Sequence, residues 1–412
     1  MTDPLVNIRK GTLLAGNLPL NMADYRSSML SGVIRLCLQT DQNASLISSL
    51  PTVISHHQLF GSQQFGSLND IIGDVNNQLN SSKKRLQGLI LLDCLIQQGS
   101  ADTFSSHCQT WLNLLLQALQ SPSSDQVHKL SLTVLSSLIE RITSFPELAR
   151  DVGTMYIAQL LPLLLTFSSG VKDEAITCIH ACVIHFPGPS GNFLNKIKSM
   201  LVEELDRATP SQAAVQCYTS LAQCGSAGTQ GTKHRKGWAE MCDSLVSSLI
   251  FWLGQLYEGL ETGLQEEEQG SDKVFGSCQL PSTQPQQTVH IVHRFQTLCL
   301  CLESLLRESF STWVQIPADK ILKLICRALA VHVNMLSCKA TTNYLLLLSY
   351  LPSIHISVLK VLSQLIVCCK RLLMPQASLI FRLVIQCLTT TNRNNMVPGV
   401  EKPFRELRES AY

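Results

Sequence analysis

The sequence has 412 residues, of which 45% are hydrophobic and only 15% are charged, and its formal net charge is +2. A protein that binds nucleic acid mainly by neutralising phosphates needs a far more basic chain, so this charge disfavours that class of function. The mean hydropathy of +0.15 is high for a soluble protein. The composition therefore predicts that much of the surface is covered.

Sixteen cysteines are scattered without paired spacing, and several, such as Cys94 and Cys299, sit in apolar runs. This pattern is typical of free thiols in a reducing compartment. The first residues lack the apolar core of a signal peptide. The longest uninterrupted apolar stretches, such as 160–165 and 345–348, are shorter than the ~20 residues that cross a bilayer. We therefore expect a protein of the cytosol or nucleus, without membrane contact.

The chain is predicted to begin with an irregular lead-in over 1–22, followed by a helix over 23–40 and by short helices or loops over 41–70. Two apolar helices over 81–119 flank a Gly-Ser-Ala-Asp break, and the second carries Trp111, Leu112, Leu115, Leu116 and Leu119 at helical spacing. A broad apolar face on both helices must be buried against further pairs on either side. This arrangement is typical of stacked helical repeats.

Helical periodicity continues to the C-terminus. Pro146 suits the first turn of a helix, and Pro162 predicts a kink or break in the helix over 155–167. Residues 264–288 have too few apolar residues to pack and predict a disordered insertion. Further helices are predicted over 124–143, 173–185, 191–206, 210–223, 236–263, 289–310, 317–336, 341–350, 353–371 and 375–389.

No alternating strand pattern competes with the helices, so we predict an all-α fold, an α-solenoid of stacked antiparallel helix pairs of armadillo or HEAT type. The expected organisation is a lead-in (1–22), an N-terminal helical-repeat region (23–263), a disordered insertion (264–288) and a C-terminal helical-repeat region (289–412). The last residues begin a helix without a polar closing repeat. A solenoid needs such a cap, so we expect the C-terminal region to be truncated.

The sequence carries no phosphate-binding loop, no GxSxG and no HExxH, so we predict a protein that is not an enzyme and has no catalytic or cofactor-binding residues. The best metal candidate is Cys178, Cys182 and His185, which share one face of the helix over 173–185. Buried free cysteine is much commoner than such a half-site, so we predict no metal.

Three places match LxxLL, a pattern whose leucines can fill an apolar groove when the helix is exposed. Two of them supply the candidate partner-binding residues Leu112, Leu115, Leu116, Leu302, Leu305 and Leu306. The third, over 160–165, contains Pro162. Leucine-rich buried helices produce the same pattern, and core packing is the favoured interpretation. Two short basic patches, a helix start at 83–85 and a predicted loop at 233–236, are alternative candidates for nuclear import or RNA contact.

Three segments carry a family resemblance: SSKKRLQGLILLDCLI (81–96), HCQTWL (107–112) and LLLLSYLPSIHISVLKVL (345–362). They resemble the animal branch of the pre-ribosomal-RNA-processing Rix family, from about residue 25 to the end of the chain. The resemblance implies a nuclear scaffold for pre-rRNA processing and maturation of the large ribosomal subunit, in the nucleolus and nucleoplasm with some cytoplasmic protein. The family's acidic tail has no counterpart here, so its interactions are not carried over.

The resemblance also implies partners. They are a WD-repeat propeller protein and a second helical-repeat protein, with a midasin-type AAA ATPase, a SUMO protease, a spacer endonuclease and the pre-ribosomal large subunit reached through the assembly. It implies no cofactor. An alternative hypothesis is a transcription coregulator that offers LxxLL helices to nuclear receptors. Homodimerisation and direct RNA contact stay open.

Overall fold

A computed structural model of the chain describes residues 68–167, 170–261, 270–276, 278–336, 342–391 and 401–412, with the isolated positions 32, 52, 54 and 56. All regular structure in these ranges is helical, which confirms the all-α prediction. The chain divides into two compact units at residues 118/119. The predicted lead-in, the helix over 23–40 and the segment 57–67 lie outside the described residues, so these predictions stay untested.

The described part of the first unit consists of α3 (Leu68–Asn80), α4 (Arg85–Gln98) and α5 (Ala101–Gln120), whose residues up to Ala118 belong to it. α3 packs on α4. Gly88 permits the close approach, because a Cβ there would meet the backbone nitrogen of Leu79 at 2.9 Å. Arg85 donates from Nε to the carbonyl of Leu79 (3.0 Å) and holds the turn between the two helices.

The break predicted inside the 81–119 pair lies at Gly99 and Ser100, where α4 ends and α5 begins. Ser100 Oγ accepts a hydrogen bond from the backbone N–H of Thr103 (3.2 Å), as an N-cap does. Phe104 and Trp111 are fully buried on α5, with ring centroids 6.1 Å apart in an edge-to-face arrangement. The predicted helix pair is confirmed.

The second unit consists of a longer series of helices. They are α6 (Asp125–Ile142), α7 (Pro146–Met155), α8 (Ile157–Leu164), α9 (Lys172–His185), α10 (Pro187–Ser190), η1 (Gly191–Phe193), α11 (Leu194–Leu205), α12 (Gln212–Ser220), η2 (Leu221–Gln223), η3 (Thr229–Gly231), α13 (Thr232–Leu256), α14 (Gln286–Arg307), α15 (Ala318–Ala330), α16 (Val333–Leu336), α17 (Thr342–Cys369), η5 (Lys370–Gln376), α18 (Ala377–Thr391) and α19 (Glu401–Ala411).

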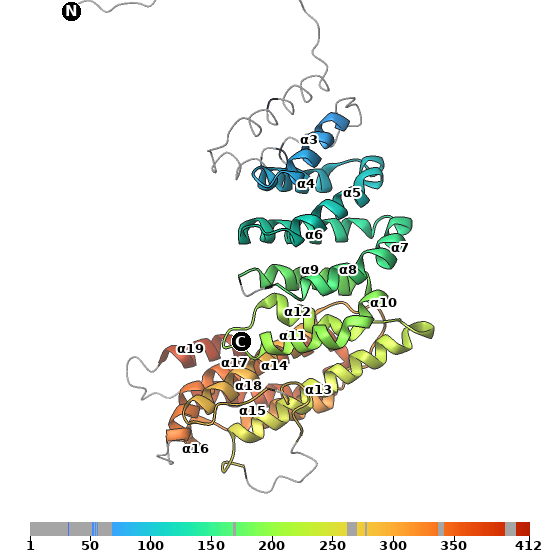
Figure 1. Cartoon of the computed structure of the whole chain (residues 1–412). Helices are drawn as coiled ribbons and strands as arrows, with labels where there is room; N and C mark the ends of the chain where they lie inside the picture. The colour runs from blue at the N-terminus through green and yellow to red at the C-terminus, as the bar shows by residue number, and fades with distance from the viewer. Residues whose placement is uncertain are drawn as a thin grey trace, which may run out of the picture. The chain divides into compact units, whose positions relative to one another are not determined.

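The main helices of this unit pack in the order in which they occur along the chain (Figure 1). α6 packs on α9, α9 on α12, and α12 on α14, while α14 also packs on α13 and α17. α17 in turn contacts α15 and α19. Because each layer buries its apolar face mainly against chain neighbours, the arrangement is that of an α-solenoid, as predicted.

Three prolines of this unit, Pro146, Pro162 and Pro352, lie at the start of one helix and inside two others. Pro146 opens α7, as expected. Pro162 lies inside α8, which ends at Leu164, so the predicted break is wrong, whereas the alternative prediction of a kink stays untested. The proline removes the hydrogen bond to the carbonyl of residue 158. The helices predicted over 341–350 and 353–371 form one helix, α17, which continues through the buried Pro352.

The segment Thr342–Thr391 is long and apolar enough to cross a membrane, by length and composition alone, and half of its most apolar window is buried inside the protein. The sequence analysis did not identify this segment because it considered only uninterrupted apolar runs. The core helix of a soluble protein passes the same test. α17 buries a stripe that includes Leu351, Val358 and Leu365 and packs on α14, so internal packing accounts for much of the hydropathy.

The predicted disordered insertion, 264–288, is described at 270–276 and from 278 onward. Phe275 is fully buried and Val274 nearly so. Residues from Gln286 already belong to α14. For these residues the structure differs from the expectation, because two apolar side chains are buried and hydrogen bonds join Ser271 and Lys273 to α13. The remaining domain boundaries stay predictions.

Candidate partner-binding surfaces

The six leucines predicted as candidate partner-binding residues lie on α5 and α14, and all are at most 7% exposed. α14 packs on α12, α13 and α17, so Leu302, Leu305 and Leu306 belong to the core of the second unit. Leu112, Leu115 and Leu116 are buried in the same way in the first unit. An LxxLL helix must be exposed to bind a groove. In this fold the leucines are core residues, as the favoured interpretation expected, and their partner-binding role stays an untested prediction.

The metal candidates on α9 are arranged as core residues. Cys178 and Cys182 are fully buried, while His185 is half-buried at the helix end. Hydrogen bonding to Cys178 and burial raise the pKa of the Cys182 thiol, as expected for a thiol inside the core. Among the residues that the structure describes, no cluster of three His, Cys, Asp or Glu side chains could hold a metal ion.

The two basic patches differ in their settings. Lys84 directly precedes α4 and Arg85 begins it, as predicted for a helix start. The second patch lies on the first turns of α13, which begins at Thr232, and not on the predicted loop. His234 is buried there, and its ring nitrogens contact Ser311 Oγ and the carbonyl of Gly225, both at 3.2 Å. Lys236 pairs with Glu240 on the same helix (3.6 Å).

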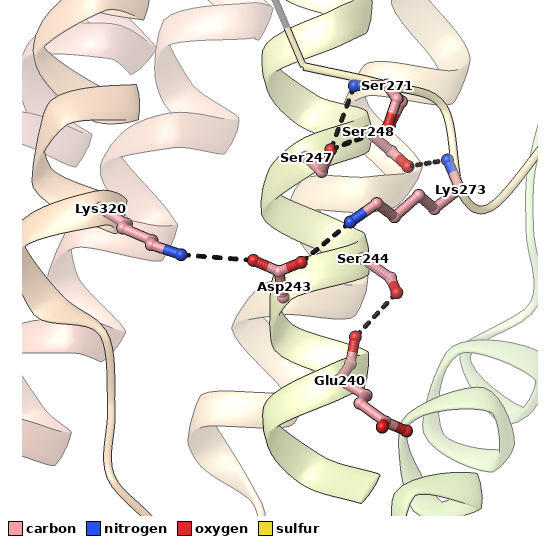
Figure 2. Close-up of polar contacts among 8 residues, drawn as sticks. All are labelled: Glu240, Asp243, Ser244, Ser247, Ser248, Ser271, Lys273 and Lys320. Atoms are coloured by element: carbon pink, nitrogen blue, oxygen red, sulfur yellow. Dashed lines mark hydrogen bonds and ion pairs between the residues drawn. The ribbon is translucent and has the colours of Figure 1, made fainter. Parts of the chain in front are cut away.

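A charged junction on α13 joins three parts of the second unit (Figure 2). Asp243 accepts hydrogen bonds from Lys273 Nζ (2.9 Å) and from Lys320 Nζ (3.4 Å), the second of which lies on α15. The hydrogen bond from Lys273 is the largest of the contacts that lower the pKa of Asp243. One carboxylate therefore ties the segment around residue 273 and the start of α15 to the same helix.

Serine side chains one turn further along α13 complete the junction (Figure 2). Ser247 Oγ accepts from the backbone N–H of Ser271 (3.1 Å), and Ser248 Oγ accepts from the backbone N–H of Lys273 (2.8 Å). A hollow of about 350 Å³ opens beside Asp243, between α13 and residues Gln315, Pro317 and Lys320. Because the charged groups of the hollow already pair with one another, the arrangement is suited to holding helices together.

A second ionic contact of this unit is a buried ion pair. Arg294 on α14 is 2% exposed and binds Asp206 through two hydrogen bonds, Nε to Oδ1 (2.6 Å) and Nη2 to Oδ2 (2.8 Å). Its guanidinium carbon lies 5.0 Å from the ring centroid of Trp252 and 5.1 Å from that of Phe275. Sequence reasoning missed the pair because 88 residues separate its members and neither lies in a recognisable motif.

This helical chain is similar to a family described as rRNA processing/ribosome biogenesis. Residues 30–212 match the RIX1 family model, described as rRNA processing/ribosome biogenesis. The mouse (Mus musculus) proline-, glutamic acid- and leucine-rich protein 1 is 33% identical over 362 residues, 87% of this chain and 32% of that protein. The Xenopus laevis protein of the same name is 31% identical over 390 residues, 93% of this chain and 38% of that protein.

The fold also matches a solved structure. A chain of the Rix1 subcomplex in the Rix1-Rea1 pre-60S particle is 13% identical, with a TM-score of 0.66, over 92% of this chain and 76% of that one. At that identity the likeness concerns the fold alone. The chain spans about a third of the length of the two curated relatives. Residues 30–212 nevertheless match the RIX1 family model, and 87–93% of the chain is similar to these two curated relatives.

Proposed function

We propose that the chain is a non-catalytic helical scaffold for pre-rRNA processing and maturation of the large ribosomal subunit. The observation that carries the proposal is the RIX1 match over residues 30–212 on a chain whose fold resembles a Rix1-subcomplex component along most of its length. An α-solenoid suits this role because it presents an extended surface to several partners at once.

The proposed partners follow from the family. They are a WD-repeat propeller protein and a second helical-repeat protein as direct partners. A midasin-type AAA ATPase, a SUMO protease, a spacer endonuclease and the pre-ribosomal large subunit are reached through the assembly. The solved Rix1-Rea1 pre-60S particle supports assembly of this general kind. We place the protein in the nucleolus and nucleoplasm, where large-subunit precursors are made, and we leave homodimerisation as a property to be measured.

The burial of both candidate LxxLL helices leaves the coregulator alternative without structural support. A receptor groove would have to compete with the core for Leu302, Leu305 and Leu306. Because removing one buried leucine costs roughly 2–5 kcal/mol, exposing three of them is a large penalty for one binding event. The scaffold hypothesis requires no such rearrangement.

The test is affinity purification of the tagged chain from nuclear extract, with bound proteins identified by mass spectrometry and bound RNA by hybridisation to pre-rRNA spacers. We expect the two direct partners and large-subunit precursors to be recovered together. The matched control is Leu305→Arg, which should disrupt the core and lose all of them. Recovery of nuclear receptors without ribosomal precursors would refute the scaffold proposal.

A further inference from the structure

α18 differs from the core helices in how little of its apolar surface it buries. Leu383, Cys387 and Thr391 are its buried residues. Phe381 is 69% exposed and Ile385 is 57% exposed, although the same residue types are buried on α14. The exposed positions 378, 381, 382, 385, 386 and 389 are spaced as one helical face. Two large apolar side chains, Phe381 and Ile385, therefore lie on an exposed face of α18 whose other positions are polar or charged.

Two further large apolar side chains are exposed on η5, the segment that leads into α18. Leu372 is 81% exposed and Met374 is 70% exposed. Single exposed apolar residues are common on protein surfaces, but a contiguous group of large ones usually marks an interaction site. Here four large side chains gather within fourteen residues of sequence (372–385), at the junction of two consecutive elements.

Charge on this part of the chain has a single sign. The sequence contains no acidic residue between Asp319 and Glu401. Lys370, Arg371 and Arg382 are exposed beside the apolar group. None of the three appears in any ion pair found within the described ranges. Asp319 on α15 comes near η5, where its Oδ1 accepts from Gln376 Nε2 (3.0 Å), and α19, which contacts α18, carries Glu406 and Glu409.

Exposed apolar anchors with unpaired cations are complementary to a helix that carries apolar and acidic residues on one side. A second copy of this chain fits poorly, because the same face would bring cations against cations. Single-stranded RNA gains most from stacking on aromatic planes, whereas three of the four anchors are aliphatic or thioether side chains. A bilayer surface is also a poor fit, because membrane binding usually needs more basic residues together than the three cations found here.

We propose that Lys370, Arg371, Leu372, Met374, Phe381, Arg382 and Ile385, the η5–α18 face, form a docking site for an acidic amphipathic helix of a partner protein. The partner's apolar side chains pack on the four anchors, and its carboxylates pair with the three cations. The proposal deepens the proposed scaffold function by naming one surface and the chemistry of what it holds. Its test uses purified components, so that its failure is distinguishable from failure of co-purification with ribosomal precursors.

The test measures fluorescence anisotropy of a labelled synthetic peptide on titration with the purified full chain. The peptide has about 18 residues, or five helical turns, with Leu on one face and Glu beside it. We expect saturable binding that weakens as salt rises. The triple reversal Lys370→Glu, Arg371→Glu and Arg382→Glu should weaken binding at least about tenfold, and so should Phe381→Ser with Ile385→Ser. Because all five side chains are exposed, thermal melting should stay unchanged.

Two matched controls come from the same unit. Lys196→Glu with Lys198→Glu reverses exposed cations on α11, and Trp313→Ser removes a side chain that is 87% exposed. Both should leave affinity within about twofold, as surface changes outside an interface do. A peptide with Lys in place of Glu should not bind. Equal binding of that peptide, or equal affinity of the triple reversal, would overturn the proposal.

Parallel titrations distinguish the other occupants. Vesicles of phosphatidylcholine and phosphatidylserine, and a single-stranded oligouridine, are added in place of the peptide. The acidic-helix proposal would be refuted if the chain bound the vesicles or the RNA, lost that binding in the triple reversal, and did not bind the acidic peptide. The face would then be assigned to a membrane or to RNA. Peptide binding that neither reagent displaces supports it.

Discussion

The Arg294–Asp206 pair allows a sharp test of how the second unit is held together. Asp206→Asn keeps the size of the side chain but removes its charge. Arg294, at 2% exposure, would then lose its ionic partner and keep the carbonyl of Cys278 (3.2 Å) and the faces of Trp252 and Phe275. A buried cation without a counter-charge is strongly unfavourable, and the unfolded state does not share that penalty.

The magnitude follows from the burial of the two partners. Removing one member of a buried ion pair costs about 3–5 kcal/mol, whereas an exposed pair contributes roughly 0–1 kcal/mol. Asp206 retains 15% side-chain exposure, so water partly compensates the change. We therefore expect the free energy of unfolding to fall by about 2–4 kcal/mol. Replacing both residues together, with Arg294→Met and Asp206→Leu, should cost less than the single change because no unpaired charge remains.

Urea unfolding followed by far-ultraviolet circular dichroism measures the change, with the m-value checked for constancy. The control is Glu409→Gln, which removes the exposed i,i+4 partner of Arg405 on α19 and should stay within about 0.5 kcal/mol of the parent. If Asp206→Asn cost no more than this control, or if the double replacement were worse than the single one, the reasoning about burial would be wrong.

Further predictions concern the core, pH and backbone. Leu305→Ala, at 5% exposure, should lower the free energy of unfolding by roughly 2–5 kcal/mol in a melting experiment, and an unchanged melting temperature would contradict core packing. Burial lowers the pKa of His355 to about 4 from 6.5, so the unfolded chain binds the proton first as pH falls. Stability should therefore decline between about pH 6.5 and about pH 4, and His355→Gln should remove roughly 3 kcal/mol of that decline in unfolding titrations at several pH values. Gly231 has φ +72°, and a Cβ there would clash with Thr312 Cγ2, so Gly231→Ala should lower the free energy of unfolding by more than about 1 kcal/mol. Gly73 is helical and has open space around it, so Gly73→Ala should raise the free energy of unfolding slightly.

The helices were predictable because their apolar residues follow the helical period. The expected helix over 124–143 is found at Asp125–Ile142, where Leu135, Leu138 and Ile142 are fully buried. Prolines were less informative about where helices end, since Pro162 and Pro352 lie inside α8 and α17. Disorder predicted from composition was also wrong at residues 270–276, where Phe275 is fully buried although most of its neighbours in sequence are polar.

The surfaces were less predictable than the helices, because periodicity shows which residues share a face but not what covers that face. Leu305 and Ile385 are both apolar residues in apolar helices, yet the first is buried by α13 and α17 and the second is exposed. Long-range ionic partners are equally hidden: Arg294 reaches across 88 residues, and Lys320 reaches across 77 residues to Asp243. The burial of an apolar residue and the partner of a charged one therefore depend on how the helix layers pack together.

Leucine-rich layers alone would allow neighbouring helices to slide by a turn with little change in apolar burial, and the polar contacts of the second unit restrict such slippage. Arg327 on α15 binds Glu261 through Nε (2.8 Å) and Nη2 (2.6 Å), and Tyr257 Oη donates to the carbonyl of Ala328 (2.8 Å). These bonds and the Lys320–Asp243 contact fix α15 against α13. α15 in turn contacts α18 and binds Gln376 through Asp319. We infer that ionic contacts set the register of the layers and thereby hold the η5–α18 face in place, which is what a scaffold needs if its docking surface is to be present before a partner arrives.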